Sequence, residues 1–136
     1  MTNSKRYSRQ MILPEIGETG QQKLQDARVL VIGAGGLGCP VLQNLVAAGV
    51  GCIGIVDGDV VEASNLQRQF LYENKDCGQL KAAVAAGVLS EMNPEVNIIA
   101  FTHHFTEANA FEIVDDYHML VDCTDSIHVR YLINDV

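Results

Sequence analysis

Basic residues are scarce in this sequence, which has 9 Lys and Arg against 17 Asp and Glu and a formal net charge of −8. Nucleic acids and anionic membrane surfaces attract basic proteins, so this balance argues against both as partners. The sequence also lacks a long apolar run. Its longest stretch without a polar side chain, residues 29–42, is interrupted by glycines and is shorter than the roughly 20 residues of a membrane helix. No apolar signal core precedes Pro14, so we expect a cytoplasmic protein.

Closely spaced metal ligands are missing as well. The four cysteines form no C-x-x-C pair, so the sequence assigns no zinc site; they are Cys39, Cys52, Cys77 and Cys123. Three of them lie in apolar stretches and are expected to be buried thiols, whereas Cys77 lies in a polar loop. His103 and His104 are adjacent, and neighbouring residues of a strand point to opposite faces. We therefore expect a strand end that meets solvent there rather than a metal site.

A glycine motif is the most informative feature that is present. The apolar run of residues 29–32 leads directly into Gly33-Ala-Gly-Gly-Leu-Gly38, and the chain then turns helical. Such a turn lets a phosphate approach backbone amides at the start of a helix, although tight packing alone can produce the same pattern. A second apolar strand ends at Asp57, 19 residues after Gly38, the spacing at which an acid reaches a ribose hydroxyl. The combination predicts a nucleotide-binding site.

The order of apolar and amphipathic segments predicts an α/β fold. We expect strands at residues 28–32, 52–56, 96–101 and 118–123, and helices at 4–10, 17–26, 37–48, 78–92, 107–114 and 127–136. Residues 59–75 are interpreted as a polar loop in which Ser64 and Asn65 could form a cap. Alternating strands and helices favour a Rossmann-like parallel sheet with right-handed crossovers and strand order 3-2-1-4.

The length and composition fit one domain. The chain has 136 residues, of which 48% are hydrophobic, so it can bury a core. We divide it into an N-terminal helical arm, residues 1–27, and a nucleotide-binding domain, residues 28–136. The last helix keeps its apolar stripe to its end, and the fourth strand is expected at a sheet edge. We therefore expect the second half of the sheet to be absent from this chain, or another chain to cover the edge; a naturally short protein with a frayed tail is the alternative.

Charged residues near the expected ligand site favour a triphosphate. Arg68 and Lys81 follow the second strand, and these residue types bind phosphate oxygens as a fork and as a compact charge. A nicotinamide cofactor has little use for both, and the alternative is that they are solvated surface charges. At the end of the fourth strand, Asp122 could be a structural acid satisfied by nearby amides, whereas Asp125 is free to meet a metal or a phosphate.

Taken together, these motifs resemble those of the ThiF/MoeB/HesA family, bacterial relatives of the ubiquitin-activating enzymes. The resemblance covers nearly the whole chain and rests on residues 6–10, 33–38, 57–59, 64–69, 78–81, 93–94, 122–125 and 130–135. It implies an ATP-dependent adenylyltransferase that activates the C-terminal glycine carboxylate of a ubiquitin-like sulfur-carrier protein in thiamine or molybdopterin biosynthesis. It also implies Mg²⁺ and a homodimer.

The resemblance implies a role for each motif residue. Four glycines would form the phosphate turn, with two amides, those of residues 35 and 36, facing the α-phosphate: Gly33, Gly35, Gly36 and Gly38. Three side chains would bind phosphates: Asn65, Arg68 and Lys81. Asp57 would hold the ribose hydroxyls, Asp125 would hold Mg²⁺, and Arg9 would reach the ATP of a partner protomer. Catalysis would depend on the charged residues near the phosphates: Arg9, Arg68, Lys81 and Asp125.

Two features depart from the family pattern. Ser126 stands where the family has Asn, and its side chain has a shorter reach. Family members also continue for roughly another hundred residues, about one small domain, which carry the carrier-binding sheet and any reactive or zinc-binding cysteines. Three alternatives stay open: a nicotinamide-binding module of an oxidoreductase, a non-catalytic nucleotide-binding or assembly fragment, and an enzyme that activates a modified tRNA base. The acidic charge argues against the last of these.

Overall fold

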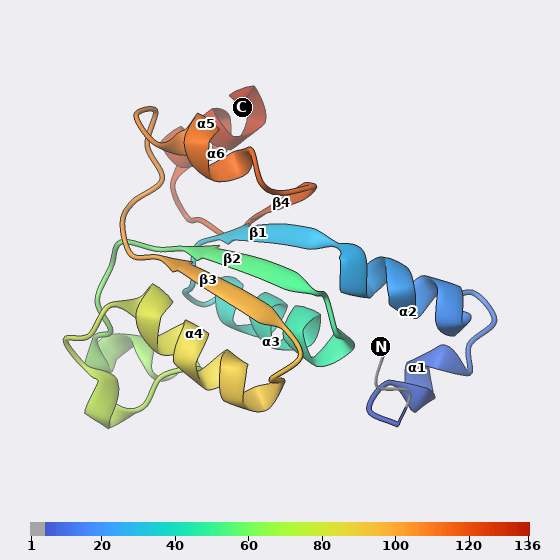
Figure 1. The fold of residues 1–136 in the computed structure, drawn as a ribbon. Helices are drawn as coiled ribbons and strands as arrows, with labels where there is room; N and C mark the ends of the chain where they lie inside the picture. The colour runs from blue at the N-terminus through green and yellow to red at the C-terminus, as the bar shows by residue number, and fades with distance from the viewer. Residues whose placement is uncertain (1–4) are drawn as a thin grey trace.

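Four short parallel strands form the centre of the computed structural model, which describes residues 5–136 (Figure 1). The strands are β1 Arg28–Ile32, β2 Cys52–Val56, β3 Asn97–Phe101 and β4 Met119–Asp122. Their order in the sheet is β3-β2-β1-β4, which confirms the predicted order and the Rossmann-like class. Because every pairing is parallel, the carboxyl ends of β1, β2 and β4 meet at one end of the sheet.

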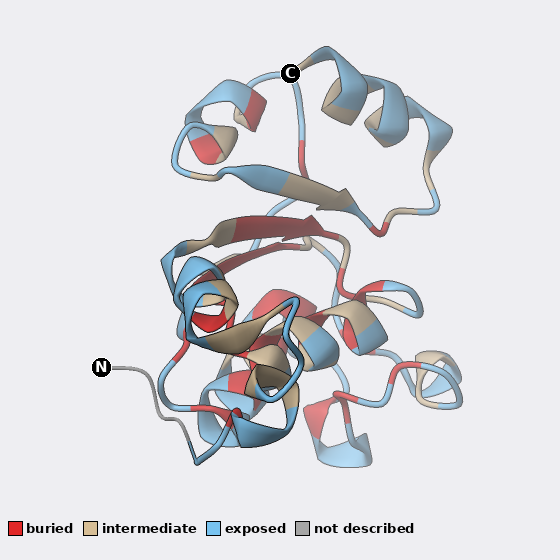
Figure 2. Ribbon diagram, turned by 90° about the vertical axis from the view of Figure 1, so that its right-hand side faces the viewer, coloured by how far each residue is buried: buried red, intermediate tan, exposed pale blue. Residues whose placement is uncertain are grey.

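The central strands are buried because helices cover both faces of the sheet (Figure 1). Helices α3 Gly38–Ala48 and α4 Lys81–Met92 lie on one face, and α5 Ala110–Val114 and α6 Ile127–Asp135 lie on the other. Alternate side chains of β1 enter different cores, since Val31 belongs to the cluster with Leu42 and Leu30 belongs to the cluster with Ile113. Figure 2 shows β1 and β2 mostly buried, whereas the edge strand β4 has only exposed and intermediate residues. None of the helices within residues 5–136 has the length and apolar character to cross a bilayer.

Helices α4 and α5 each begin three residues later than the sequence pattern predicts. Helix α4 begins at Lys81 rather than at residue 78, because Gly78 adopts a φ of +88° and Leu80 is extended. Helix α5 begins at Ala110 rather than at residue 107, because the Asn109 side chain accepts a backbone hydrogen bond and holds a turn in front of it. The later start of α4 makes Lys81 the first residue of a helix, next to the loop that follows β2.

The predicted polar loop after β2 contains two short 3₁₀ helices, Ala63–Asn65 and Asn74–Asp76. The prediction that Ser64 and Asn65 form a cap is wrong, because Asn65 is the last residue of the first 3₁₀ turn and the turn has no side-chain cap. The main-chain oxygen of Asn65 instead accepts the N–H groups of Arg68 and Gln69, at 3.1 and 3.0 Å. This turn therefore fixes the backbone of residues 68 and 69.

The N-terminal arm consists of α1 Ser8–Met11 and α2 Gly17–Asp26. The sequence predicts the first helix at residues 4–10, and of these residue 4 lies outside the described part of the chain. The arm docks beside the end of α3, where the side chains of Gln10 and Gln21 donate to the carbonyl oxygen of Ala48, at 2.8 and 3.0 Å. The hydroxyl of Tyr7 accepts from Asn93, just ahead of β3, at 2.9 Å. The arm is thus held at the amino end of the sheet.

Candidate functional site

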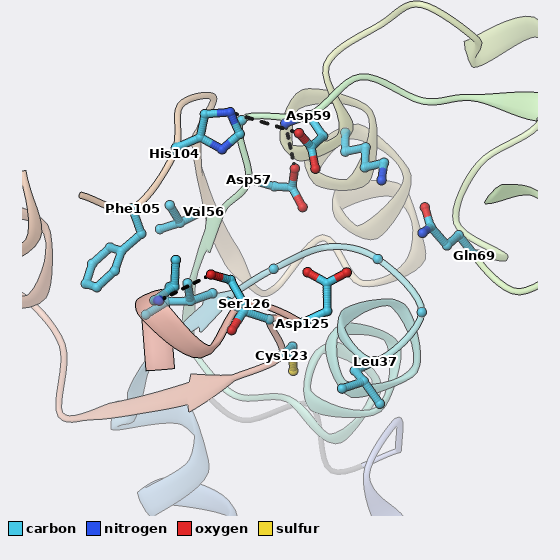
Figure 3. Close-up of a pocket in the computed structure, with 18 of the residues that line it drawn as sticks. Leu37, Val56, Asp57, Asp59, Gln69, His104, Phe105, Cys123, Asp125 and Ser126 are labelled. Atoms are coloured by element: carbon cyan, nitrogen blue, oxygen red, sulfur yellow. Dashed lines mark hydrogen bonds and ion pairs between the residues drawn. The ribbon is translucent and has the colours of Figure 1, made fainter. Parts of the chain in front are cut away.

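A pocket of about 530 Å³ opens at the carboxyl end of the sheet (Figure 3). The ends of β1, β2 and β4 all contribute to its wall, because β2 and β4 flank β1 in the sheet. The loop after β2, the first residue of α4 and the segment before α5 complete it. Open parallel sheets bind ligands at this position, and the volume is typical of sites for small molecules.

The four glycines of the turn after β1 serve two different purposes. Gly33 has a φ of +103°, and a Cβ on it would lie 2.6 Å from the carbonyl oxygen of Cys123. Gly38 is buried, and a Cβ on it would lie 1.9 Å from the carbonyl oxygen of Gly33. These two glycines let the turn close against its own helix and against the end of β4. Gly35 and Gly36 line the pocket together with Gly33, whereas Gly38 does not.

Asp57, which follows β2, is tied to the glycine turn. Its Oδ2 accepts the backbone N–H of Ala34 and its Oδ1 accepts that of Asp59, both at 2.8 Å. Tyr72 holds the same turn, because its hydroxyl donates to the carbonyl oxygen of Ala34 at 2.6 Å. Burial raises the pKa of Tyr72 far above its usual value, so this hydroxyl remains a hydrogen-bond donor. The half-buried carboxylate of Asp57 lines the pocket (Figure 3).

Two basic side chains line the same pocket, Arg68 and Lys81. Lys81 is only 6% exposed, and its ammonium has no hydrogen bond or ion pair with another residue of the described chain. As the first residue of α4 it stands where the positive end of the helix dipole disfavours a cation. The alternative of a solvated surface charge is therefore wrong for Lys81, whose buried charge calls for an anion from outside the chain. Arg68 is exposed, and its Nη1 donates to the carbonyl oxygen of Ser64 at 3.2 Å.

The turn after β4 contains one structural aspartate and one unpaired aspartate. Oδ1 of Asp122 accepts the backbone N–H and the hydroxyl of Thr124, at 3.0 and 2.8 Å. Its Oδ2 lies 3.5 Å from Nε of Arg130. Both carboxylate oxygens of Asp122 thus contact groups of its own chain, which fits the expected role of a structural acid. Asp125 is exposed, lines the pocket, and has no hydrogen bond or ion pair within residues 5–136.

Asp125 is also the residue to which the family resemblance assigns Mg²⁺. Within residues 5–136, His, Cys, Asp and Glu form no group of three or more that could hold an ion. A cation at Asp125 would therefore share its coordination with oxygens of a bound ligand, which is how proteins commonly hold Mg²⁺. The neighbouring Ser126 has a separate task, because its Oγ accepts the N–H of Val129 at 3.4 Å and caps α6.

Several residues that line the pocket were not among the predicted site residues, and three of them bear on its chemistry: Gln69, His104 and Phe105. His104 is exposed, as expected, but its ring packs on Gly58, where a Cβ would lie 2.7 Å from Cγ of the ring. Its Nε2 lies 4.0 Å from Oδ1 of Asp59 (Figure 3). Phe105 belongs to an apolar wall with Ile32, Val56 and Val129. No local sequence pattern points to residues 104 and 105, because only the pairing of β3 with β2 brings them to the pocket. Gln69 directly follows Arg68, so its place next to a predicted site residue could have indicated it.

Besides Gly38, two residues of the predicted site lie outside the pocket lining, Asn65 and Arg9. Asn65 is half-buried in its 3₁₀ turn and supports the pocket wall through its main-chain bonds to residues 68 and 69. Arg9 is exposed on α1, at the amino end of the sheet, whereas the pocket lies at the carboxyl end (Figure 1). Arg9 therefore does not contribute to the pocket of its own chain.

The sequence is similar to a family model and to curated proteins whose names describe adenylyltransferases. The model of the ThiF family matches residues 7–136. The adenylyltransferase and sulfurtransferase uba4 of Emericella nidulans is 53% identical over 96% of this chain and 27% of its own length. The sulfur carrier protein adenylyltransferase of Thermus thermophilus is 53% identical over 96% of this chain and 48% of its own length. The chain thus spans between about a quarter and a half of the length of these curated relatives.

Two solved structures share the architecture and were determined with a nucleotide or an analogue. The E. coli tRNA N6-threonylcarbamoyladenosine dehydratase TcdA, in complex with ATP, aligns with a TM-score of 0.84 and 30% identity over 91% of this chain and 51% of that chain. E. coli MccB with AMPCPP and MccA aligns with a TM-score of 0.84 and 28% identity over 98% of this chain and 41% of that chain.

Proposed function

The chain belongs to the ThiF family, and on this premise we propose that it binds ATP and transfers the adenylyl group to the C-terminal glycine carboxylate of a ubiquitin-like sulfur-carrier protein. The carrier is of the class used in thiamine or molybdopterin biosynthesis. One relative is named a sulfur carrier protein adenylyltransferase and TcdA was solved with ATP, and both facts support the proposal. The observation that carries it is Lys81, a buried and unpaired ammonium in a pocket beside a glycine turn.

In the proposed complex, each part of the nucleotide meets a matching group. The ribose hydroxyls donate to Asp57, because each of its oxygens accepts one backbone N–H and keeps further acceptor capacity. The α-phosphate lies against the amides of Gly35 and Gly36 at the start of α3. Arg68 and Lys81 donate to the phosphates. The adenine contacts the apolar wall to which Phe105 belongs, and Asn65 acts by holding the turn that carries Arg68.

The proposed reaction depends on positioning and on charge neutralisation. A carboxylate oxygen of the carrier attacks the α-phosphorus, the bond from that phosphorus to the bridging oxygen of the β-phosphate breaks, and pyrophosphate leaves. The products are an acyl-adenylate and pyrophosphate. Arg68 and Lys81 neutralise the negative charge that develops on the leaving group. Asp125 would hold Mg²⁺, whose positive charge adds to this neutralisation, and an exposed carboxylate without a partner fits an ion shared with phosphate oxygens.

We also propose a homodimer in which Arg9 acts across the interface. The arm, residues 1–27, of one protomer would bring Arg9 to the nucleotide domain, residues 28–136, of the other. The exposure of Arg9 and its place at the far end of its own sheet support an action on a second chain.

Exchange of labelled pyrophosphate into ATP by the full-length protein tests the proposed function. Exchange is expected with a sulfur-carrier protein that ends in glycine and not with the same carrier lacking its last glycine. Calorimetry with ATP and with NAD separates the proposal from a nicotinamide-binding module, and tighter binding of NAD would contradict it. A modified tRNA that supports exchange in place of any carrier would favour the tRNA alternative, which the net charge of −8 disfavours.

A further inference from the structure

Gln69 is a buried polar side chain in the pocket that lacks a partner in the protein. It is 4% exposed, and its carboxamide oxygen Oε1 is buried without a hydrogen bond to any described residue. The other such atom in residues 5–136, the hydroxyl of Tyr117, packs against Gly54 on the face of the sheet that α5 covers, and Tyr117 does not line the pocket. Oε1 is an acceptor and cannot pair with an anion, but Nε2 of the same carboxamide also has no hydrogen bond to a described residue, so Gln69 keeps a free donor at the pocket wall.

The backbone fixes the Gln69 side chain in front of the glycine turn. The N–H of Gln69 donates to the carbonyl oxygen of Asn65 at 3.0 Å. A Cβ on Gly35 would lie 3.1 Å from Nε2 of Gln69, so the carboxamide occupies the space in front of that glycine. The Arg68 side chain covers Gly36 in the same way, at 3.7 Å from such a Cβ. Figure 3 shows the carboxamide directed toward the pocket.

Gln69 and Lys81 together form an incomplete anion site. Both side chains are more than nine-tenths buried, both line the pocket, and neither is fully paired within the described chain. The ammonium supplies positive charge, and a carboxamide N–H donates to an anion without adding charge. We infer that Gln69 is a further nucleotide-binding residue, whose Nε2 donates to a phosphate oxygen in front of Gly35. The identity of the ligand as ATP rests on the proposed function, whereas the donor and its position do not.

Gln69→Glu in the full-length protein tests the donor. The change keeps the size of the side chain, replaces the donating NH₂ with a carboxylate oxygen, and places a negative charge against the phosphate. Calorimetry is expected to show ATP binding weakened by about tenfold or more and adenosine binding unchanged. The matched control is Gln67→Glu, which adds the same charge on an exposed residue of the same loop that does not line the pocket. Equal ATP affinities of the two variants would overturn the inference.

Gln69→Met separates ligand binding from packing. Methionine has a similar length, buries well, and removes both polar ends of the carboxamide. Because it removes an unpaired buried oxygen, it is expected to raise the unfolding temperature of the ligand-free protein while weakening ATP binding. If Gln69 had only a structural role, Gln69→Met would lower the unfolding temperature and leave the ATP affinity unchanged.

Inorganic tripolyphosphate distinguishes a failure of this inference from a failure of the proposed function. If the wild-type protein binds tripolyphosphate but not ATP, and Gln69→Glu abolishes that binding, the proposed function fails and Gln69 remains an anion-binding residue. If the wild-type protein binds ATP and the Gln69 variants bind it equally well, the proposed function stands and the inference fails. If the wild-type protein binds neither compound, both fail.

Discussion

Lys81 is buried at the edge of the pocket without a carboxylate partner in the described part of the chain. Removing an ammonium from water costs several kcal/mol, which most buried lysines offset with an ion pair. For Lys81 only a bound ligand can supply this offset. The ligand-free protein is therefore expected to be less stable than a variant with an apolar residue at position 81. The same burial that costs stability strengthens the attraction to phosphate, because the pocket wall excludes water from the charge.

The variant Lys81→Met is expected to raise the unfolding temperature of the ligand-free protein and to weaken ATP binding. Each charge-assisted contact with a phosphate contributes roughly 1.5–3 kcal/mol, so the Kd for ATP should rise by about 10-fold to 150-fold. Thermal unfolding and calorimetry measure the two effects. Lys75→Met is the matched control, because Lys75 is exposed and its Nζ pairs with Glu73 at 3.3 Å. An unchanged ATP affinity in Lys81→Met would remove the main support for the proposed function.

Two aspartates of one turn allow a comparison of a functional carboxylate with a structural one. Asp125→Asn is expected to reduce pyrophosphate exchange by about a hundredfold or more without changing the unfolding temperature, because an amide holds Mg²⁺ poorly. Asp122→Asn is expected to lower the unfolding temperature and to retain exchange, because Asp122 binds Thr124 and Arg130 of its own chain. Exchange assays and thermal unfolding on both variants check this pattern. An active Asp125→Asn protein would assign the metal elsewhere, with Asp122 as the next candidate.

At the scale of an element, the turn between β1 and α3 depends on close backbone contacts. The helix begins at Gly38, directly against the carbonyl oxygen of Gly33, and the end of β4 covers Gly33 in turn. No side chain fits between these backbone segments. The first and last glycines of the motif are therefore required by the fold, whereas Gly35 and Gly36 line the pocket and are the two whose amides we propose to face the α-phosphate.

Gly38→Ala is accordingly expected to destabilise the protein, because its Cβ would lie 1.9 Å from the carbonyl oxygen of Gly33. Overpacking of a rigid backbone contact costs about 1–3 kcal/mol or more, which lowers the unfolding temperature by several degrees. Gly36→Ala is the control, since its Cβ would meet only the Arg68 side chain at an ordinary 3.7 Å. Similar unfolding temperatures for the two variants would show that the turn can relax.

At the scale of the whole molecule, the arm and the pocket occupy opposite ends of the sheet. Gln10 and Gln21 hold the arm to Ala48, where α3 ends, and the pocket lies where α3 begins. The proposed action of Arg9 on a nucleotide therefore requires the pocket of a second molecule. A two-fold dimer would give each pocket one arm from the partner, so the proposed reaction site would be shared between protomers.

Mixed dimers of Arg9→Ala and Lys81→Ala test this arrangement in the full-length protein. Each variant alone is expected to be inactive in pyrophosphate exchange, because every site lacks one phosphate-binding group. In co-refolded mixtures half of the dimers are heterodimers, and one of their two sites is intact, so activity should return to about a quarter of the wild-type value. No recovery despite confirmed heterodimers would mean that Arg9 acts within its own chain or has no role.

The sequence by itself determined the strands, their order and the glycine turn. Residues 29–32 and 52–56 are continuous apolar runs because both faces of these strands are buried, and burial on both faces leaves a local signature. The position of Asp57 follows from the same pattern, since a residue directly after a parallel strand must stand at the ligand end of the sheet. Helix starts were less accurate, because the backbone of Gly78 and the extended Leu80 delay α4 to Lys81.

The tertiary structure alone decided which charges are buried and which segments share the pocket. Lys81 and Gln69 have polar side chains of the kind that usually lie at the surface, yet both are buried, and Gln69 lies against Gly35 of the glycine turn. His104 and Phe105 enter the pocket because β3 pairs with β2, and Arg9 stays out because the arm docks at the other end. Local periodicity reports the burial of a segment, whereas the partners of a single polar side chain depend on contacts between segments distant in the sequence.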